Sequence, residues 1–253
     1  MSFSNSYEDS RRAESYAKLE FPGTYYIAYR DLPEIIRCHA GGGKALDFGC
    51  GAGRSKRFLQ RLGFDVIGVD ISRDMISRAK SMDPHGDYRL IEDGDLRQLE
   101  DTAFDLVLSA FAFDNIAPME HKVRLFFELA KKLNDDGKIV SLVSSPDIYI
   151  HEWASFTTGD FPENRAAKSG DTVRIIMTDV EDARPVEDIL CTDEAYREVY
   201  GRAGLEPVAV YHPLAKADEP FAWVNEERIP PWTIYVLRKA QSRKKSPLLN
   251  HSE

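Results

Sequence analysis

The chain has 253 residues, of which 43% are hydrophobic and 30% charged, and its formal net charge at pH 7 is −9. This length and apolar content suffice for one large domain with a full hydrophobic core. The negative charge argues against a protein whose main task is to bind nucleic acid, because such proteins usually carry a basic surface. No apolar run reaches the length of a membrane span and the N-terminus lacks a signal-peptide core, so we expect a cytoplasmic protein without membrane contact.

The first forty residues predict an N-terminal helical cap. Residues 1–20 are polar, and residues 21–23, Phe-Pro-Gly, predict a turn. The spacing of Leu32, Ile35 and Ile36 then predicts an amphipathic helix over residues 27–38. The three cysteines of the chain, Cys38, Cys50 and Cys191, are odd in number and widely spaced. This pattern fits a reducing compartment and predicts no metal site.

A glycine-rich loop follows the first predicted strand. The apolar segment 45–48 is typical of a parallel strand that is buried on both faces. Gly49, Gly51 and Gly53 come next, just before a helix predicted over residues 54–62. Glycine lets the backbone turn sharply while a ligand approaches it, and the following helix directs its free N–H groups at that ligand. The segment therefore predicts the strand, loop and helix of a nucleotide-type cofactor site.

Strand and helix patterns alternate along the rest of the first 145 residues. Further strands are predicted at 65–69, 88–91, 104–109 and 139–143, with helices from Ser72 and from Pro118 between them. The acidic turn at residues 135–137 is expected to end the second of these helices. Strands that alternate with helices at this spacing indicate βαβ units and a parallel sheet.

The alternation stops at residue 144. Two extended segments, 172–178 and 186–191, predict a β-hairpin inserted after the fifth strand. A helix over 192–204 and strands at 207–211 and 232–237 then complete the sheet. We accordingly divide the chain into a helical cap (1–40), a cofactor-binding core (41–145), an inserted hairpin lid (146–191), a C-terminal helix with the last two strands (192–238) and a basic tail that is expected to be disordered (239–253).

The glycine spacing and its companions carry a family resemblance. A dinucleotide site needs a small residue where Arg54 stands, whereas the spacing here is G-x-G-x-G with Asp47 before it. Asp70 ends the second strand, Asp95 ends the third, and the fourth strand is apolar. Residues 40–145 thereby resemble the class I S-adenosylmethionine-dependent methyltransferases, and the last two strands fit the same family. The chain lacks the Asn/Asp-Pro-Pro-aromatic motif of members that methylate nucleic-acid amino groups or glutamine, and it also lacks the cysteine signature of cytosine methylation.

The resemblance implies an α/β fold with a seven-stranded, mostly parallel sheet, helices on both faces and a reversed last strand. It also implies that S-adenosylmethionine lies on the glycine loop, with Asp70 at the ribose and Asp95 or Asp93 at the adenine. Arg30 is the expected partner of the cofactor's carboxylate, with a surface arginine as the alternative. For Asp70, a structural role at a helix N-terminus is the alternative, and for Asp95 a solvated loop position. The residues expected at the cofactor are Tyr25, Arg30, Asp47, Phe48, Gly49, Cys50, Gly51, Gly53, Asp70, Ile71, Met75, Gly94, Asp95, Leu96, Ala110 and Phe111.

The acceptor pocket is expected after the fifth strand. His151 is the candidate catalytic base, with a structural histidine as the alternative, and His121 is interpreted as structural. The acids of the hairpin either favour a cationic acceptor or are simply solvated. The residues expected to wall the acceptor pocket are Tyr26, Phe113, Tyr149, Trp153, Phe156 and Trp223. A place in the hydrophobic core or its cover is the alternative for these aromatic side chains.

The function that the sequence favours is methyl transfer from S-adenosylmethionine to a nitrogen or oxygen of a small-molecule metabolite. A module that binds the cofactor without turnover and a nicotinamide-dependent oxidoreductase are the alternatives. The insert is interpreted as a lid over the acceptor, because insertions of nearly fifty residues inside compact domains are usually functional or disordered. A homodimer contact is its alternative role, since an exposed hairpin edge invites pairing.

Overall fold

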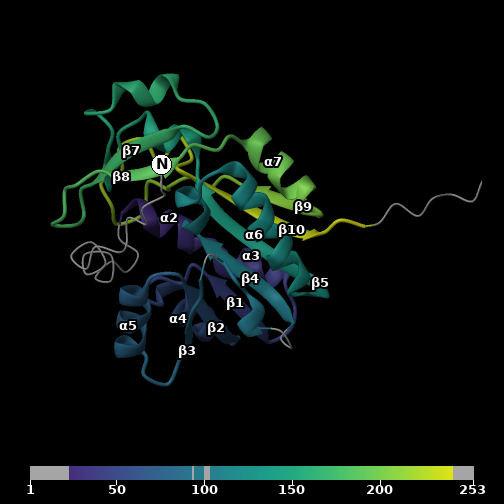
Figure 1. Ribbon diagram of the computed structural model, residues 1–253. Helices are drawn as coiled ribbons and strands as arrows, with labels where there is room; N and C mark the ends of the chain where they lie inside the picture. Colours follow the sequence, from purple (N-terminus) through teal and green to yellow (C-terminus); the bar gives the residue numbers. More distant parts are fainter. Residues whose placement is uncertain (1–22, 93, 100–102, 242–253) are drawn as a thin grey trace, which may run out of the picture.

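The computed structural model describes residues 23–92, 94–99 and 103–241. Residues 1–22 of the predicted cap, Asp93 and the predicted tail from residue 242 lie outside this part. Seven of its strands belong to one sheet: β1 (Lys44–Phe48), β2 (Asp65–Asp70), β3 (Asp87–Leu90), β4 (Phe104–Ala110), β5 (Leu133–Ser144), β9 (Leu205–Tyr211) and β10 (Trp232–Lys239). Their order is β3-β2-β1-β4-β5-β10-β9 (Figure 1).

The sheet has the predicted direction of its strands. The strands from β1 to β5 pair in parallel, and β10 pairs antiparallel with both β5 and β9. The mostly parallel sheet with a reversed last strand is therefore confirmed. The order reverses at β1, which lies between β2 and β4, and a crevice at the carboxyl ends of strands around such a point is where open α/β sheets bind ligands.

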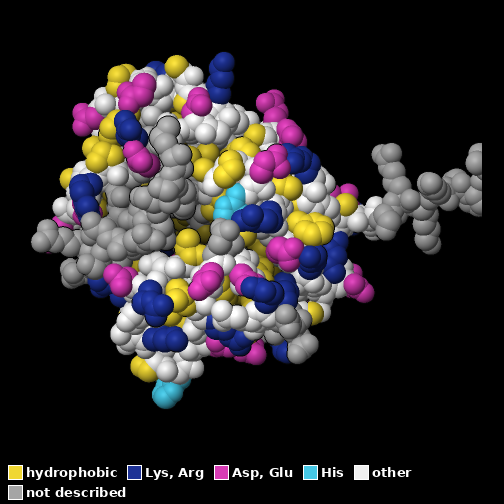
Figure 2. Space-filling view, viewed as in Figure 1, with side chains coloured by type: hydrophobic (Ala, Val, Ile, Leu, Met, Phe, Trp, Pro, Cys, Tyr) yellow, Lys and Arg dark blue, Asp and Glu magenta, His cyan; other side chains and the backbone are white. Residues whose placement is uncertain are grey.

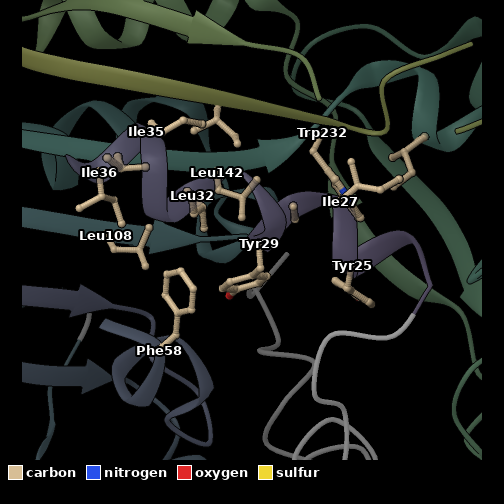
Figure 3. Packing of buried hydrophobic residues seen from close by; sticks show 14 of the residues in the cluster. Tyr25, Ile27, Tyr29, Leu32, Ile35, Ile36, Phe58, Leu108, Leu142 and Trp232 are labelled. Atoms are coloured by element: carbon tan, nitrogen blue, oxygen red, sulfur yellow. The ribbon is translucent and has the colours of Figure 1, made fainter. Parts of the chain in front are cut away.

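Helices cover both faces of the sheet. On one face, α2 (Thr24–Arg30), α3 (Leu32–His39) and α4 (Arg54–Arg61) share a hydrophobic cluster with β4, β5 and β10. Figure 3 shows this packing, with Ile36 and Leu108 together and the ring of Phe58 next to Tyr29. On the other face, α6 (Met119–Lys131) and α7 (Asp193–Arg202) form a second cluster with the sheet. α5 (Arg73–Met82) packs beside β2 and β3 at the edge.

Two predicted helix boundaries are wrong. The helix predicted over residues 27–38 begins at Thr24 and is divided at Asp31 into α2 and α3. Pro33 explains the break, because its ring nitrogen cannot donate the hydrogen bond that would continue α2. The second error concerns α6, which ends at Lys131, while the acidic turn that was expected to end it lies inside β5. There, a Cβ on Gly137 would lie 2.7 Å from the carbonyl oxygen of Phe104, so this glycine permits close contact between strands.

The insert after β5 is a small antiparallel sheet. It contains η3 (Pro146–Tyr149), β6 (Phe156–Thr157), η4 (Pro162–Ala166), β7 (Thr172–Met177) and β8 (Val186–Ile189). The predicted hairpin of β7 and β8 is present, and β6 adds a third strand to it. Val173, Ile175 and Met177 alternate along β7 and are buried in the same cluster as α2. In Figure 1 the insert lies at one end of the molecule, with α4 and α5 toward the other. Within the described residues, no helix combines the length and the apolar character that crossing a membrane would require.

Candidate active site

The glycine loop between β1 and α4 is tied to the end of β2. The N–H groups of Gly49 and Cys50 donate to the carbonyl oxygen of Val69 at 2.9 and 3.0 Å, and the N–H of Gly51 donates to the Asp70 carboxylate at 2.8 Å. Gly51 has a φ of +51°, a conformation that other residues rarely adopt. A Cβ added at Gly51 would meet no protein atom within 4 Å. The loop therefore faces open space, as a backbone that must approach a ligand requires.

Asp70 holds two neighbouring segments at once. Its second oxygen accepts a hydrogen bond from the N–H of Ser72 at 2.8 Å, and the Ser72 hydroxyl caps α5 by accepting from Met75. Burial raises the pKa of the Asp70 carboxyl, and the hydrogen bonds from the backbone of Ser72 and Gly51 partly offset this rise. The carboxylate thus stands in a fixed orientation at the switch point of the sheet.

A cavity of about 270 Å³ opens in front of the loop. In the space-filling view, hydrophobic side chains are visible in the centre of the face between areas of mixed charge (Figure 2). The residues predicted for the cofactor or the acceptor that line this cavity are Tyr25, Phe48, Gly49, Cys50, Gly51, Asp70, Ile71, Met75, Gly94, Ala110, Phe111, Tyr149 and Phe156.

Aromatic rings form one wall of the cavity. Phe111 has a positive φ of 64°, which is unusual for a bulky residue, and its N–H is held by the carbonyl oxygen of Leu142 at 2.8 Å. Its ring centroid lies 4.7 Å from that of Trp232 and 5.6 Å from that of Tyr25. Phe156, from the insert, lies 5.3 Å from Tyr25. The faces of such rings attract cations, including a sulfonium.

Two charged residues predicted at the cofactor lie away from the cavity lining. The Arg30 guanidinium is paired with Asp31 at 2.7 Å and with Glu219 at 2.5 Å. The Asp95 carboxylate accepts hydrogen bonds from the guanidinium of Arg97, two positions along the chain, and does not line the cavity. Both departures have the same physical cause, because each charge is already satisfied by a nearby partner of opposite sign.

Three further cofactor residues also lie behind the lining. Asp47 is fully buried and accepts a hydrogen bond from the Ser55 hydroxyl at 2.6 Å. Burial raises the pKa of Asp47 to about 7. A Cβ on Gly53 would meet the Tyr88 ring, so this glycine serves the packing of α4. Leu96 is buried in the second hydrophobic cluster.

Most of the residues predicted for the acceptor pocket do not line the cavity. Phe113 is fully buried, and its ring stacks on that of Phe126 at 3.8 Å between centroids. Trp153 is also buried and donates its indole N–H to the carbonyl oxygen of Ile148. His151 lies outside the lining with its Nε2 4.0 Å from Asp147. Tyr26 and Trp223 also lie outside the lining, and each packs against the ring of Phe221.

Several charged or polar side chains that the sequence did not single out for the site also line the cavity, among them Arg54, Asp114, His121 and Asp188. The Arg54 guanidinium lies 5.3 Å from the ring of Tyr25 and 5.4 Å from that of Tyr29. Asp114 follows the carboxyl end of β4. Because open α/β sheets bind ligands at the carboxyl ends of their strands, this position could have identified Asp114 as a site residue from the sequence. His121 was interpreted as structural from its place in α6. Asp188 belongs to β8, and only the folding of the insert brings it to the cavity.

Asp114 is held by several hydrogen bonds. It accepts from the N–H and the hydroxyl of Ser144 at 3.0 and 2.8 Å, and from the hydroxyl of Tyr196 at 3.4 Å. Burial raises the pKa of Asp114 to about 6, although the nearby ammonium of Lys122 counteracts this rise. Burial lowers the pKa of Lys122, while the carboxylates of Asp114 and Asp188 partly oppose that change.

The family model described as a methyltransferase domain matches residues 46–141, which include the glycine loop, Asp70 and the end of β4. This match, together with the fold and the curated relatives, supports a class I S-adenosylmethionine-dependent methyltransferase. This methyltransferase is 27% identical over 212 residues to N-demethylindolmycin N-methyltransferase of Streptomyces griseus, an alignment that covers 83% of this chain and 88% of the relative. It is also 31% identical over 142 residues to the ubiquinone biosynthesis O-methyltransferase of Bradyrhizobium diazoefficiens, covering 47% of this chain and 54% of that one.

Solved structures share the fold of the methyltransferase. The CcbJ methyltransferase from Streptomyces caelestis superposes with a TM-score of 0.63 at 18% identity, covering 90% of this chain and 96% of that one. An S-adenosylmethionine-dependent methyltransferase from Clostridium acetobutylicum gives a TM-score of 0.60 at 13% identity, covering 93% and 96%. The methyltransferase domain that matches residues 46–141 implies S-adenosylmethionine as the cofactor of this enzyme. Three features of the lining suit the parts of this cofactor. The open space at Gly51 suits the methionine part, the fixed carboxylate of Asp70 suits the ribose hydroxyls, and the aromatic wall suits the sulfonium.

Proposed function

We propose that this methyltransferase methylates a nitrogen or an oxygen of a small molecule. The main observation behind this proposal is that the glycine loop and the insert line the same cavity. The insert contributes Tyr149, Phe156, Ile175 and Val186 to the lining. A cavity of about 270 Å³ that the insert walls in this way favours a small acceptor over an extended polymer. The relative from Streptomyces griseus, named as an N-methyltransferase of a small molecule, supports the same class of acceptor.

We assign each polar part of the cofactor to a polar or charged group of the cavity lining. The glycine loop would face the methionine part of S-adenosylmethionine, and Asp70 would accept hydrogen bonds from the ribose hydroxyls. We place the cofactor's carboxylate near Arg54, since Arg30 is occupied by Asp31 and Glu219. When bound, the cofactor would supply an activated methyl group, and the residues of the cavity lining would hold the acceptor's nitrogen or oxygen toward it.

The insert would act as a lid in this reaction. Ile175 of β7 is 3% exposed and lines the cavity, and Val186 and Phe156 are buried beside it. Side chains of this kind exclude water from the sulfonium and shape the space left for the acceptor. The chain's own contribution to rate is then mainly the positioning of the two reactants.

The proposal is tested by incubating the enzyme and S-adenosylmethionine with each member of a panel of small amines, phenols and carboxylates. The rate at which S-adenosylhomocysteine is released is measured for each acceptor. We expect turnover with at least one small acceptor. Binding of the cofactor by calorimetry without turnover of any acceptor in the panel would favour a binding module instead. Binding of NAD in preference to S-adenosylmethionine would favour the oxidoreductase.

A further inference from the structure

We propose that the acceptor is an amine that binds as a cation beside Asp188 and Asp114. This inference rests on the proposed function and gives it a substrate class. It begins from Asp188, a residue of the inserted sheet that lies outside the segment matched by the family model. A group supplied by the insert, and not by the cofactor-binding core, is placed to select the acceptor.

The Asp188 carboxylate is fixed in position. The Tyr149 hydroxyl donates to one of its oxygens at 3.0 Å, and the Asn115 amide donates to the other. Asp188 is 7% exposed, and both of its partners line the cavity with it. Because these two partners come from η3 and from η2 (Ala112–Asn115), the carboxylate is held by the insert on one side and by the core on the other.

Charge is distributed unevenly along the cavity. Among the described lining residues, the two arginines, Arg54 and Arg57, both come from α4 beside the glycine loop. Apart from Asp70, the lining acids are Asp114 and Asp188, from η2 and β8. The arginine side suits the cofactor's own carboxylate. The two carboxylates of the acidic side, which the single ammonium of Lys122 offsets in part, would repel a carboxylate acceptor and attract an ammonium.

The aromatic wall suits a cationic acceptor as well as the cofactor's sulfonium. Phe156 of the insert and Trp232 of β10 line the cavity with their ring centroids 5.8 Å apart in an edge-to-face arrangement. A cavity that combines aromatic rings with carboxylates recognises organic cations by two separate attractions. A neutral phenol could donate a hydrogen bond to a carboxylate but would lack the charge attraction that an ammonium adds.

The amine must be deprotonated before it reacts. An ammonium has no lone pair, so one N–H bond breaks, the proton passes to a neighbouring carboxylate or to water, and the electron pair stays on nitrogen. Asp114 is suited to hold such a proton because its pKa is about 6. The other titratable side chains around these carboxylates are His121, Lys122, Tyr149, Cys191 and Tyr196.

Binding of matched probes to the protein saturated with S-adenosylhomocysteine tests the inference. Phenethylamine, 2-phenylethanol and 3-phenylpropionate have similar shapes and carry a positive, a neutral and a negative group. By calorimetry we expect the amine to bind at least ~tenfold more tightly than the alcohol, and the propionate to bind most weakly. Asp188→Asn should remove the preference for the amine while leaving the affinity for S-adenosylhomocysteine within a few-fold. Asp160→Asn, an exposed acid of the same insert, is the matched control and should keep the preference.

The outcomes separate this inference from the proposed function. Equal or tighter binding of the alcohol or the propionate, an unchanged preference in Asp188→Asn, or binding of none of the three probes would overturn the amine assignment. If Asp188→Asn does not fold, Asp114→Asn serves in its place with the same expected result. Turnover of phenols or carboxylates but not of amines would leave the small-molecule function intact and reject this inference. Amine binding without turnover of any acceptor would reject the function instead.

Discussion

The backbone N–H of Gly51 donates a 2.8 Å hydrogen bond to the carboxylate of Asp70. Nineteen positions separate the two residues, and the bond connects the loop after β1 to the end of the neighbouring strand β2. Asp70 therefore shapes the loop that faces the cofactor besides lining the cavity itself. A substitution at this position acts on both features at once.

Asp70→Ala should weaken binding of S-adenosylmethionine by at least ~tenfold, because charge-assisted hydrogen bonds contribute roughly 1.5–3 kcal/mol each. Calorimetry with the cofactor measures the loss. Methylthioadenosine, which keeps the ribose but lacks the amino acid, should lose affinity to the same degree. Wild-type affinity in the variant would contradict the placement of the ribose at Asp70.

Gly51→Val should abolish measurable cofactor binding while circular dichroism shows a retained fold. The substitution forces a positive φ on a β-branched residue and fills the space in front of the loop. Gly63→Val is the matched control, since Gly63 also has a positive φ and open surroundings but lies outside the cavity lining. If both variants lost the same affinity, backbone strain alone would explain the effect.

Asp47→Asn should raise the melting temperature at pH 8 and have little effect near pH 4. The pKa of Asp47 is about 7 in the folded protein against an ordinary value of 3.8, so the folded state holds a proton that the unfolded state has released between these values. Stability from this group is hence present at low pH and lost as the pH rises toward 7. Asparagine can still accept from Ser55 but carries no charge near Asp70.

The size of the Asp47→Asn effect can be read from thermal scans across this pH range. Each kcal/mol gained at pH 8 would raise the melting temperature of a chain of this length by about 2–4 °C. A lower melting temperature for the variant at pH 8 would show that the buried carboxylate is stabilising when ionised.

His151→Ala should leave turnover within a few-fold of wild type, because His151 lies outside the cavity lining and faces Asp147. Steady-state rates of S-adenosylhomocysteine release measure this. Tyr149→Phe is the informative comparison, since it removes the hydroxyl that donates to Asp188 and should reduce kcat/KM for the acceptor. A large loss of kcat in His151→Ala alone would restore this histidine as the candidate base.

Ile175→Ala should change the range of accepted substrates while leaving cofactor affinity within a few-fold, because Ile175 lines the cavity from the lid. Val173→Ala is the control, since Val173 is buried on the same strand but does not line the cavity. Loss of buried methyl groups should destabilise both variants, by about 1–5 kcal/mol. Competition between acceptors of different size measures the change, and identical acceptor preferences in the two variants would contradict the lid.

Point substitutions are preferable to removing the lid. Val173, Ile175 and Met177 pack in the same hydrophobic cluster as α2 and Trp232. Replacing residues 161–186 by a glycine–serine link would therefore remove part of the core along with the lid. A loss of activity in such a variant would not distinguish a missing lid from a damaged fold.

Local sequence determined the frame of this protein. The alternation of strand and helix patterns, the glycines at 49, 51 and 53 and the acid after β2 depend on periodicity and backbone conformation within a few residues. These features therefore predicted the sheet and the side of it on which the cofactor-binding loop lies. The three-stranded insert was only half predicted, because the two-residue strand β6 is too short to carry a periodic signal.

Tertiary structure alone decided which side chains face the cavity. Phe111 and Phe113 are two positions apart and equally aromatic, yet the positive φ of Phe111 leaves its ring at the cavity while Phe113 stacks in the core. Arg30 and Arg54 were likewise equivalent in charge, and Glu219, 189 positions away, pairs with Arg30. Asp188 meets Asn115 and Tyr149 only once the insert folds onto the core. Contacts between residues so distant along the chain leave no local periodicity, because they depend on how whole elements pack against one another.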